Sequence, residues 1–289
     1  MATIPKIILK TRRATEKAES LIHSLGYRVA PVDPLAVVES EAPILVARGD
    51  DFRDRFDGQL EYHSSKRRFL LLYNTKYDRG DKHHPRTRFS IAHELGHYFI
   101  EAHHAHLRRG GKPHPSRDEF ASAVDMEREA DAFAAGLLMP SVLIGPRVNE
   151  SDLSLDRIRE LADEFQMSLV STAIRGSQVS HFPTAVAGIR DGNVMWQFQA
   201  DCLVEAGCYP GERGPLRSAA ARDAWREFQA GGDVRTRGTS FVKEWFRTYD
   251  KAELDHRSVT EEYLPVPTME TLVVVLSIPE DELYDDEED

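Results

Sequence analysis

The chain has 289 residues and an ordinary globular composition, with 41% hydrophobic and 29% charged residues. This length is ample for one large core or for two domains, and the absence of any run of eighteen apolar residues argues against a membrane-spanning helix. The formal charge is −11, but eight of the acidic residues lie in the last ten positions, so the rest of the chain is close to neutral. We expect residues 279–289 to form a disordered acidic tail.

The two cysteines, Cys202 and Cys208, are too few for a disulfide framework or a cysteine-rich zinc site. Near the N-terminus the only apolar run is Ile7-Ile8-Leu9, which is too short for the core of a signal peptide. The sequence therefore predicts a soluble protein of the reducing cytoplasm.

In chain order, apolar residues at helical spacing predict a helix over residues 14–25 that ends at Gly26. The Pro31-Val-Asp-Pro34 turn precedes a short helix over residues 35–38, and the apolar runs 44–47 and 69–73 predict strands. The second strand ends at Asn74, shortly before a histidine-rich helix. If this strand lies at a sheet edge, an extended peptide could pair with it.

The segment His93-Glu94-Leu-Gly-His97 carries the clearest chemistry in the chain. Its two histidines lie one turn apart on one face of a helix, so both imidazoles can hold one zinc ion at about 2.0–2.1 Å. Glu94 lies beside them, where its carboxylate can take a proton from the attacking water. The five letters alone can occur by chance on a surface helix. Most of the neighbouring residues are apolar, however, and buried histidine and glutamate are costly unless they are paired or bound to a metal.

A catalytic zinc ion needs a third protein ligand and an open position for water. His103 has the spacing of a longer H-x-x-G-x-x-H motif, but Ile100 stands where that motif needs a glycine to turn the chain. Glu101 lies one full helical turn beyond His97 and would overshoot the metal. On the next predicted helix, residues 125–139, Glu129 borders the apolar face, and we therefore choose it as the third ligand.

On the same helix, Glu127 and Asp131 fit an ordinary charged surface at least as well as a site role. Asp131 or Asp125 could also accept a hydrogen bond from a metal-bound imidazole. The remaining histidines of this region are expected to lie in solvated, flexible connections because mobile loops make poor ligands. They are His83, His84, His104, His106 and His114.

These segments together resemble the ImmA/IrrE metallopeptidases of bacteria and their mobile elements. The resemblance rests on Asn74, on the run from Arg86 to His97 and on the run from Glu127 to Pro140, and with the leading helix it covers about residues 10–175. It implies a zinc-dependent cytoplasmic endopeptidase that cleaves a helix-turn-helix repressor and so relieves transcription of stress-response or mobile-element genes. The family pattern also implies Glu129 as the third ligand. Many members have histidine where this chain has Glu101.

The second half of the chain begins with two helices, over residues 155–165 and about 168–175, in a helix-turn-helix outline. Their acidic residues outnumber their basic ones, so we expect protein contacts or a structural role, and direct DNA binding is not expected. Beyond Pro183, a hairpin with an Asp191-Gly192 turn, a helix over 217–228 and strands over 241–246 and 271–278 predict a separate α+β domain. Its three tryptophans, Trp196, Trp225 and Trp245, are expected in the core.

The sequence thus predicts an α+β protein with a zincin-like peptidase core over residues 1–145. A helix-turn-helix-like unit over 146–180, an α+β domain with a possible sensory role over 181–278 and the tail would follow. We expect His93, His97 and Glu129 to bind zinc, or manganese in its place, and Glu94 to act as the general base. The oxyanion donor could be Tyr73, Tyr77, Tyr98 or a loop histidine. The alternatives are a non-catalytic regulator with a structural zinc, and a zinc hydrolase acting on a small molecule.

Overall fold

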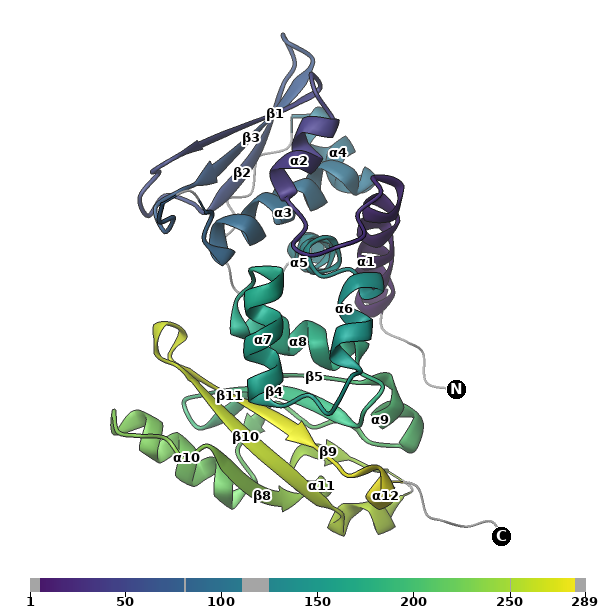
Figure 1. The fold of residues 1–289 in the computed structure, drawn as a ribbon, viewed down its shortest axis with the longest axis vertical. Helices are drawn as coiled ribbons and strands as arrows, with labels where there is room; N and C mark the ends of the chain where they lie inside the picture. Colours follow the sequence, from purple (N-terminus) through teal and green to yellow (C-terminus); the bar gives the residue numbers. More distant parts are fainter. Residues whose placement is uncertain (1–5, 81, 111–124, 250, 284–289) are drawn as a thin grey trace. The chain divides into compact units, whose positions relative to one another are not determined.

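The structure is a computed structural model that describes residues 6–80, 82–110, 125–249 and 251–283 (Figure 1). The chain divides into two units, one formed by residues 1–143 and 162–168 and the other by residues 144–161 and 169–289. Each unit combines helices with its own β-sheet, which confirms the α+β fold class. The functional assignment of three predicted regions and a tail stays a prediction.

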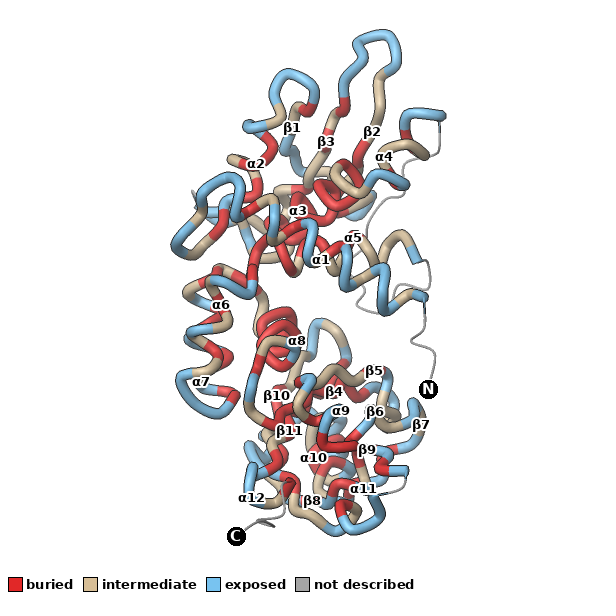
Figure 2. The backbone as a smooth tube through the Cα atoms, turned by 90° about the vertical axis from the view of Figure 1, so that its right-hand side faces the viewer, coloured by how far each residue is buried: buried red, intermediate tan, exposed pale blue. Residues whose placement is uncertain are grey.

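Over its described residues, the first unit places a small sheet beside five helices. Its helices are α1 (Lys6–Ser24), α2 (Pro34–Ser40), α3 (Pro85–Phe99), α4 (Glu101–Arg108) and, last, α5 (Asp125–Leu138), and its strands are β1 (Leu45–Asp50), β2 (Gly58–His63) and β3 (Arg68–Asn74). The histidine motif lies on α3, which is buried from Thr87 to Tyr98 and is red along most of its length in Figure 2. This helix packs against α5 and against the sheet, so the motif lies in the core of the unit.

The strand order in this sheet is β1-β3-β2, with β1 parallel and β2 antiparallel to β3. The strand predicted over residues 69–73 is therefore central, and Leu71 is fully buried. Because β3 pairs on both sides, the prediction that this strand offers its edge to a peptide is wrong. The edge next to α3 belongs to β2, which packs on that helix and which the sequence reading missed.

The second unit is organised around a six-stranded sheet of order β7-β5-β4-β11-β10-β8, in which all neighbours are antiparallel. Its helices are α6 (Ser141–Val148, which begins at the end of the first unit), α7 (Leu155–Phe165, which ends within the first unit), α8 (Leu169–Val179), α9 (Asp201–Ala206), α10 (Ala219–Gln229), α11 (Val242–Trp245) and α12 (Glu280–Leu283). Its strands are β4 (Thr184–Arg190), β5 (Asn193–Gln199), β6 (Tyr209–Pro210), β7 (Gly214–Pro215), β8 (Arg237–Phe241), β9 (Phe246–Arg247), β10 (Ser258–Val266) and β11 (Thr271–Ser277). Figure 1 shows α8 over one face of this sheet and α10 over the other.

The predicted hairpin is present as β4 and β5, and both turn residues have positive φ, 52° at Asp191 and 69° at Gly192. The three tryptophans are buried, as predicted. The strand predicted over residues 241–246 is wrong, because β8 ends at Phe241 and the helix α11 follows. Residues 280–283 form the short helix α12 with Leu283 buried, so this part of the predicted tail is ordered, whereas residues 284–289 lie outside the described residues.

Among the described residues, no single helix is both long and apolar enough to cross a membrane. Together α5 and α6 reach such a length and composition, but a bend of 70° separates them.

Candidate metal centre

The two histidines of the motif meet at their Nε2 atoms. His93 and His97 are buried, with 3% and 4% of their surface exposed, and their Nε2 atoms lie 3.2 Å apart. Helix α3 begins at Pro85 after His84, whose imidazole accepts a hydrogen bond from the N–H of Arg86. The motif therefore occupies the middle of a capped and buried helix, which fixes the two side chains in position.

The acidic side chain that joins the two histidines is Glu127. Its Oε2 lies 3.2 Å from the Nε2 atom of His93, and its Oε1 lies 3.5 Å from the Nε2 atom of His97. Among the described residues, these three side chains form a group whose ligand atoms all lie within 4.8 Å of one another. Two ligands at 2.0–2.1 Å from a tetrahedral zinc ion are roughly 3.3–3.4 Å apart, so the observed separations fit this geometry.

Asp131 fixes the orientation of the first imidazole. His93 Nδ1 lies 2.9 Å from its Oδ1, so in the neutral ring an Nδ1–H that donates to Asp131 leaves the Nε2 lone pair available to a metal ion. When both rings are neutral and Nε2 carries no proton, two imidazole lone pairs and a carboxylate face one another in a buried space, and a positive charge at its centre stabilises this arrangement. Burial lowers the pKa of His93, but its hydrogen bonds to Asp131 and Glu127 outweigh this effect and raise the pKa well above its ordinary value. The donor set therefore fits a metal cation.

Glu129, the predicted third ligand, lies outside this group. One of its oxygens contacts Lys10 Nζ at 3.2 Å, and the other lies 3.7 Å from His103 Nε2. The difference arises from the way the two helices cross at Gly96, where an added Cβ would lie 3.0 Å from the Cα atom of Ala130. Glu127 lies one turn before Ala130 on the face that meets α3, whereas Glu129 is rotated away toward α1. The structure thus corrects the choice of Glu129, and the apolar pattern alone could not reveal which side of the face meets α3.

Glu94 is only 1% exposed and follows His93 directly, and its charge helps to raise the pKa of that histidine. Glu101 is exposed at the start of α4, as expected for a residue outside the site. The chain does break at Ile100, which has extended backbone angles, and this break places the ring of His103 5.1 Å from that of His97. The sequence argument against a turn at Ile100 was therefore wrong, although His103 still lies outside the group of three.

The other histidines are more ordered than expected. His83 contacts Asp78 at 2.6 Å, and the same aspartate accepts a hydrogen bond from the backbone N–H of His84 just before α3. His104 packs on the ring of Phe69 at 4.7 Å. His106 belongs to α4, and His114 lies outside the described residues. The prediction of a flexible, solvated connection is wrong for the first three.

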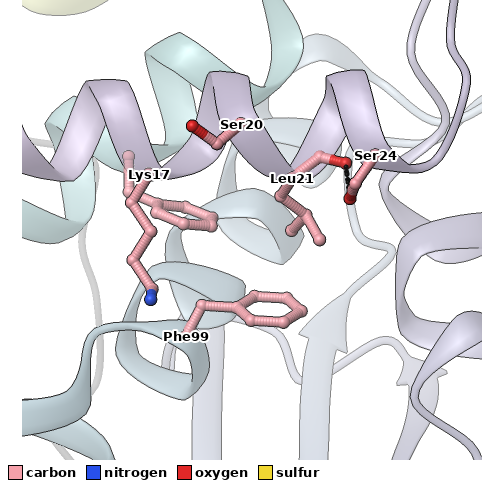
Figure 3. A pocket seen from close by; sticks show the side chains of 6 residues that line it. Lys17, Ser20, Leu21, Ser24 and Phe99 are labelled. Atoms are coloured by element: carbon pink, nitrogen blue, oxygen red, sulfur yellow. Dashed lines mark hydrogen bonds between the residues drawn. The ribbon is translucent and has the colours of Figure 1, made fainter.

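Of the tyrosines considered as oxyanion donors, Tyr98 donates its hydroxyl to Glu41 Oε2 at 2.9 Å. A shallow hollow of about 280 Å³ lies between α1 and the facing parts of α3 and α5 (Figure 3). Its lining is Lys17, Ser20, Leu21, Ser24, Phe99 and Phe133, and none of the metal-centre side chains contributes to it. This hollow is thus separate from the group formed by His93, His97 and Glu127.

Residues 77–177 match the family model described as Peptidase_M78, the IrrE N-terminal-like domain. This segment is similar to a peptidase domain of the IrrE type. The match confirms the resemblance to ImmA/IrrE proteins and spans α3 and α5, which carry the metal centre. The match points to a peptidase and therefore to a hydrolase.

Comparison of the whole fold finds a solved structure described as a Mycobacterium tuberculosis transcriptional regulator. It is 14% identical with a TM-score of 0.58, and the alignment covers 94% of this chain and 77% of that chain. At this identity the likeness shows a shared fold. Among curated proteins, none matches this sequence.

Proposed function

We propose that this chain is a zinc-dependent endopeptidase. The observation that carries the proposal is the convergence of His93, His97 and Glu127 at separations of 3.2–3.5 Å, with Asp131 behind the first histidine. The match to a peptidase family supports it independently. These three side chains would hold the ion, which supplies Lewis acidity at the scissile carbonyl and lowers the pKa of a water molecule toward 7.

Glu94 is the proposed general base. Its carboxylate accepts a proton from the attacking water and later delivers this proton to the amine that leaves when the peptide bond breaks. The position of Glu94 next to His93, on the same buried helix, keeps the base beside the ligand set. A site with only a structural role would need no such base, and it would commonly close its fourth metal position with another protein ligand.

The edge of β2 is the proposed binding surface for an extended substrate. This strand packs against α3 and pairs with β3 on one side, so its other side can form main-chain hydrogen bonds with a peptide. Such bonds depend little on side chains. They position a polypeptide for cleavage and favour a protein substrate over a small molecule.

We further propose that the substrate is a cytoplasmic helix-turn-helix repressor, whose cleavage would derepress stress-response or mobile-element genes. This step rests on the likeness to ImmA/IrrE proteins. The regulator-like fold is compatible with such a role. The IrrE-like segment ends within α8, so the larger sheet beyond it is free to serve a separate purpose, and sensing of the inducing signal is our proposal for it.

The test compares the wild type with Glu94→Gln in the native host, at rest and under stress, by sequencing newly formed protein N-termini. Glu94→Gln should retain bound zinc and lose at least about 99% of turnover, since proton transfer by a positioned base typically contributes about 10²–10⁴-fold. A fragment present only with the wild type would identify the substrate. Equal cleavage by zinc-loaded Glu94→Gln would contradict the role of Glu94. Absence of any fragment in both strains would favour a non-catalytic regulator.

A further inference from the structure

His103 is a buried histidine for which the proposed mechanism has no use. It lies on α4, is 1% exposed and packs its ring against that of His97, with the ring centres 5.1 Å apart and the planes inclined by 41°. Its Nε2 atom lies 3.7 Å from Glu129 Oε2, and the other oxygen of this carboxylate contacts Lys10. A chain of three side chains therefore runs from α1 to a histidine of the metal centre.

The burial of an imidazole at this place needs a reason. In the described parts of the chain, neither ring nitrogen of His103 has a partner within hydrogen-bond distance. Burying an unpaired polar group is costly, and a phenyl ring would fill the same space without that cost. The carboxylate of Glu129 is an acceptor close to this ring, with Oε2 only a few tenths of an ångström beyond hydrogen-bond range of Nε2.

Resting on the proposed function, we infer that His103 is a positioning residue for the metal ligand His97. A small shift of the Glu129 side chain lets it accept the Nε2–H of His103, and this bond fixes the plane of the His103 ring. The fixed ring in turn holds the His97 imidazole with its Nε2 lone pair toward His93 and Glu127. Side chains that support metal-binding histidines from outside the ligand set commonly change metal affinity by 10–100-fold when they are replaced.

Three variants of the full-length protein separate the hydrogen bond from the packing. His103→Phe keeps a ring but loses the N–H, and His103→Gln keeps an amide N–H near the position of Nε2 but loses the ring. His104→Phe is the control, because that neighbouring ring packs on Phe69 and Tyr98 away from the metal centre. The measurements are the zinc dissociation constant, from competition with a chromophoric chelator, and the visible spectrum of the cobalt-substituted protein.

We expect His103→Phe to weaken zinc binding at least about tenfold and to shift the cobalt spectrum. His103→Gln should recover most of the affinity, and His104→Phe should match the wild type. If His103→Phe is too unstable to purify, Glu129→Ala replaces it. The Glu129 side chain is 12% exposed, so its removal deletes the hydrogen-bond acceptor of His103 without altering a fully buried side chain. Glu129→Ala should weaken zinc binding by several-fold.

Wild-type affinity and spectrum in His103→Phe would show that the ring only fills space, and would overturn the inference. Equal losses in His103→Phe and His103→Gln would overturn the hydrogen-bond role. Two zinc ions per wild-type chain, one of them lost in His103→Phe, would make His103 a ligand instead. A wild-type protein that binds no zinc would contradict the proposed function together with this inference. A wild-type protein that binds zinc, with variants that match it, would contradict this inference alone.

Discussion

At the scale of single residues, the assignment of the third ligand decides how the centre works. Glu127→Gln keeps the size of the side chain but removes the negative charge that faces both histidines, so zinc binding should weaken by at least about 100-fold, a loss of about 2.7 kcal/mol. Glu129→Gln should stay within about threefold of the wild type. Zinc titration of both variants at pH 7.5 checks this expectation, and the reverse order would restore Glu129 as the ligand.

Some residues of the candidate metal centre could be predicted from the sequence and others could not. The spacing of His93, Glu94 and His97 predicted that these side chains share one helix, and the structure shows them buried on α3. The acidic partner could not be chosen in this way. Glu127 and Glu129 are two residues apart, and which one meets the histidines depends on the contact between Gly96 and Ala130, a property of the helix pair. The role of Asp131 as acceptor for His93 was one of two options that the sequence left open.

At the scale of elements, the crossing of α3 and α5 depends on Gly96. A Cβ at this position would lie 3.0 Å from the Cα atom and 3.2 Å from the carbonyl oxygen of Ala130, which cannot move without moving α5. Gly96→Ala should therefore lower the free energy of unfolding by about 1–3 kcal/mol and weaken zinc binding, because Glu127 would shift with its helix.

The matched control for this substitution is Gly145→Ala in α6, where an added Cβ meets no atom within 4 Å apart from its chain neighbours and the backbone of its own helix. Alanine favours a helix more than glycine does, but Pro146 disfavours the helical conformation of the residue before it, so these two effects oppose each other and the free energy of unfolding should change by less than about 1 kcal/mol. Urea denaturation of the metal-free proteins measures both changes. Equal stability of the two variants would mean that the helices accommodate a methyl group at their crossing.

The second element-scale prediction concerns the edge of β2. In an extended peptide paired with this strand, every second residue directs its N–H toward β2, so proline at alternate positions removes these hydrogen bonds. A proline scan of an identified substrate, excluding the residues that flank the cleaved bond, should lower kcat/KM with a period of two. Uniform tolerance of proline on both sides of the bond would contradict edge pairing.

Sequence reading of the elements was reliable where the local pattern was strong. The Asp191-Gly192 hairpin and strand β11 were predicted correctly. The tight turn requires a characteristic residue pair, and a strand buried on both faces requires a continuous apolar run, so both features can be read from the sequence. Strand β2 was missed because its two large apolar residues, Leu60 and Tyr62, alternate with polar ones over a short span, and this strand is only partly buried. Without β2, the sequence could not show that β3 is central. Strand order is a tertiary property, so the peptide-binding edge had to come from the structure.

At the scale of the whole molecule, Cys208 reports on the integrity of the second unit. It is fully buried in the core of that unit, and burial raises the pKa of its thiol to about 11. An unfolded thiol has a pKa of about 8.5, so the folded unit retains this proton more strongly. The stability that this provides is present below about pH 8.5 and is lost as the pH rises toward 11.

Cys202→Ser leaves Cys208 as the one thiol in the sequence. At pH 8 its reaction with an aromatic disulfide reagent should be at least about 100-fold slower than that of a free cysteine, and urea should accelerate it in step with unfolding. Reaction at the speed of a free thiol in native buffer would contradict the burial. Fluorescence of the buried tryptophans provides an independent measure of unfolding.

The strand order of the larger sheet also sets a sequence of events during synthesis. Strand β4 lies at the centre of that sheet and pairs with β11, so Thr184 meets Ser277 about 90 residues later. The ribosome must release most of this intervening chain before the centre of the sheet can close. All the ligand side chains of the metal centre lie before residue 132 and leave the ribosome much earlier. A nascent chain could therefore acquire its metal while its C-terminal half is still unfolded.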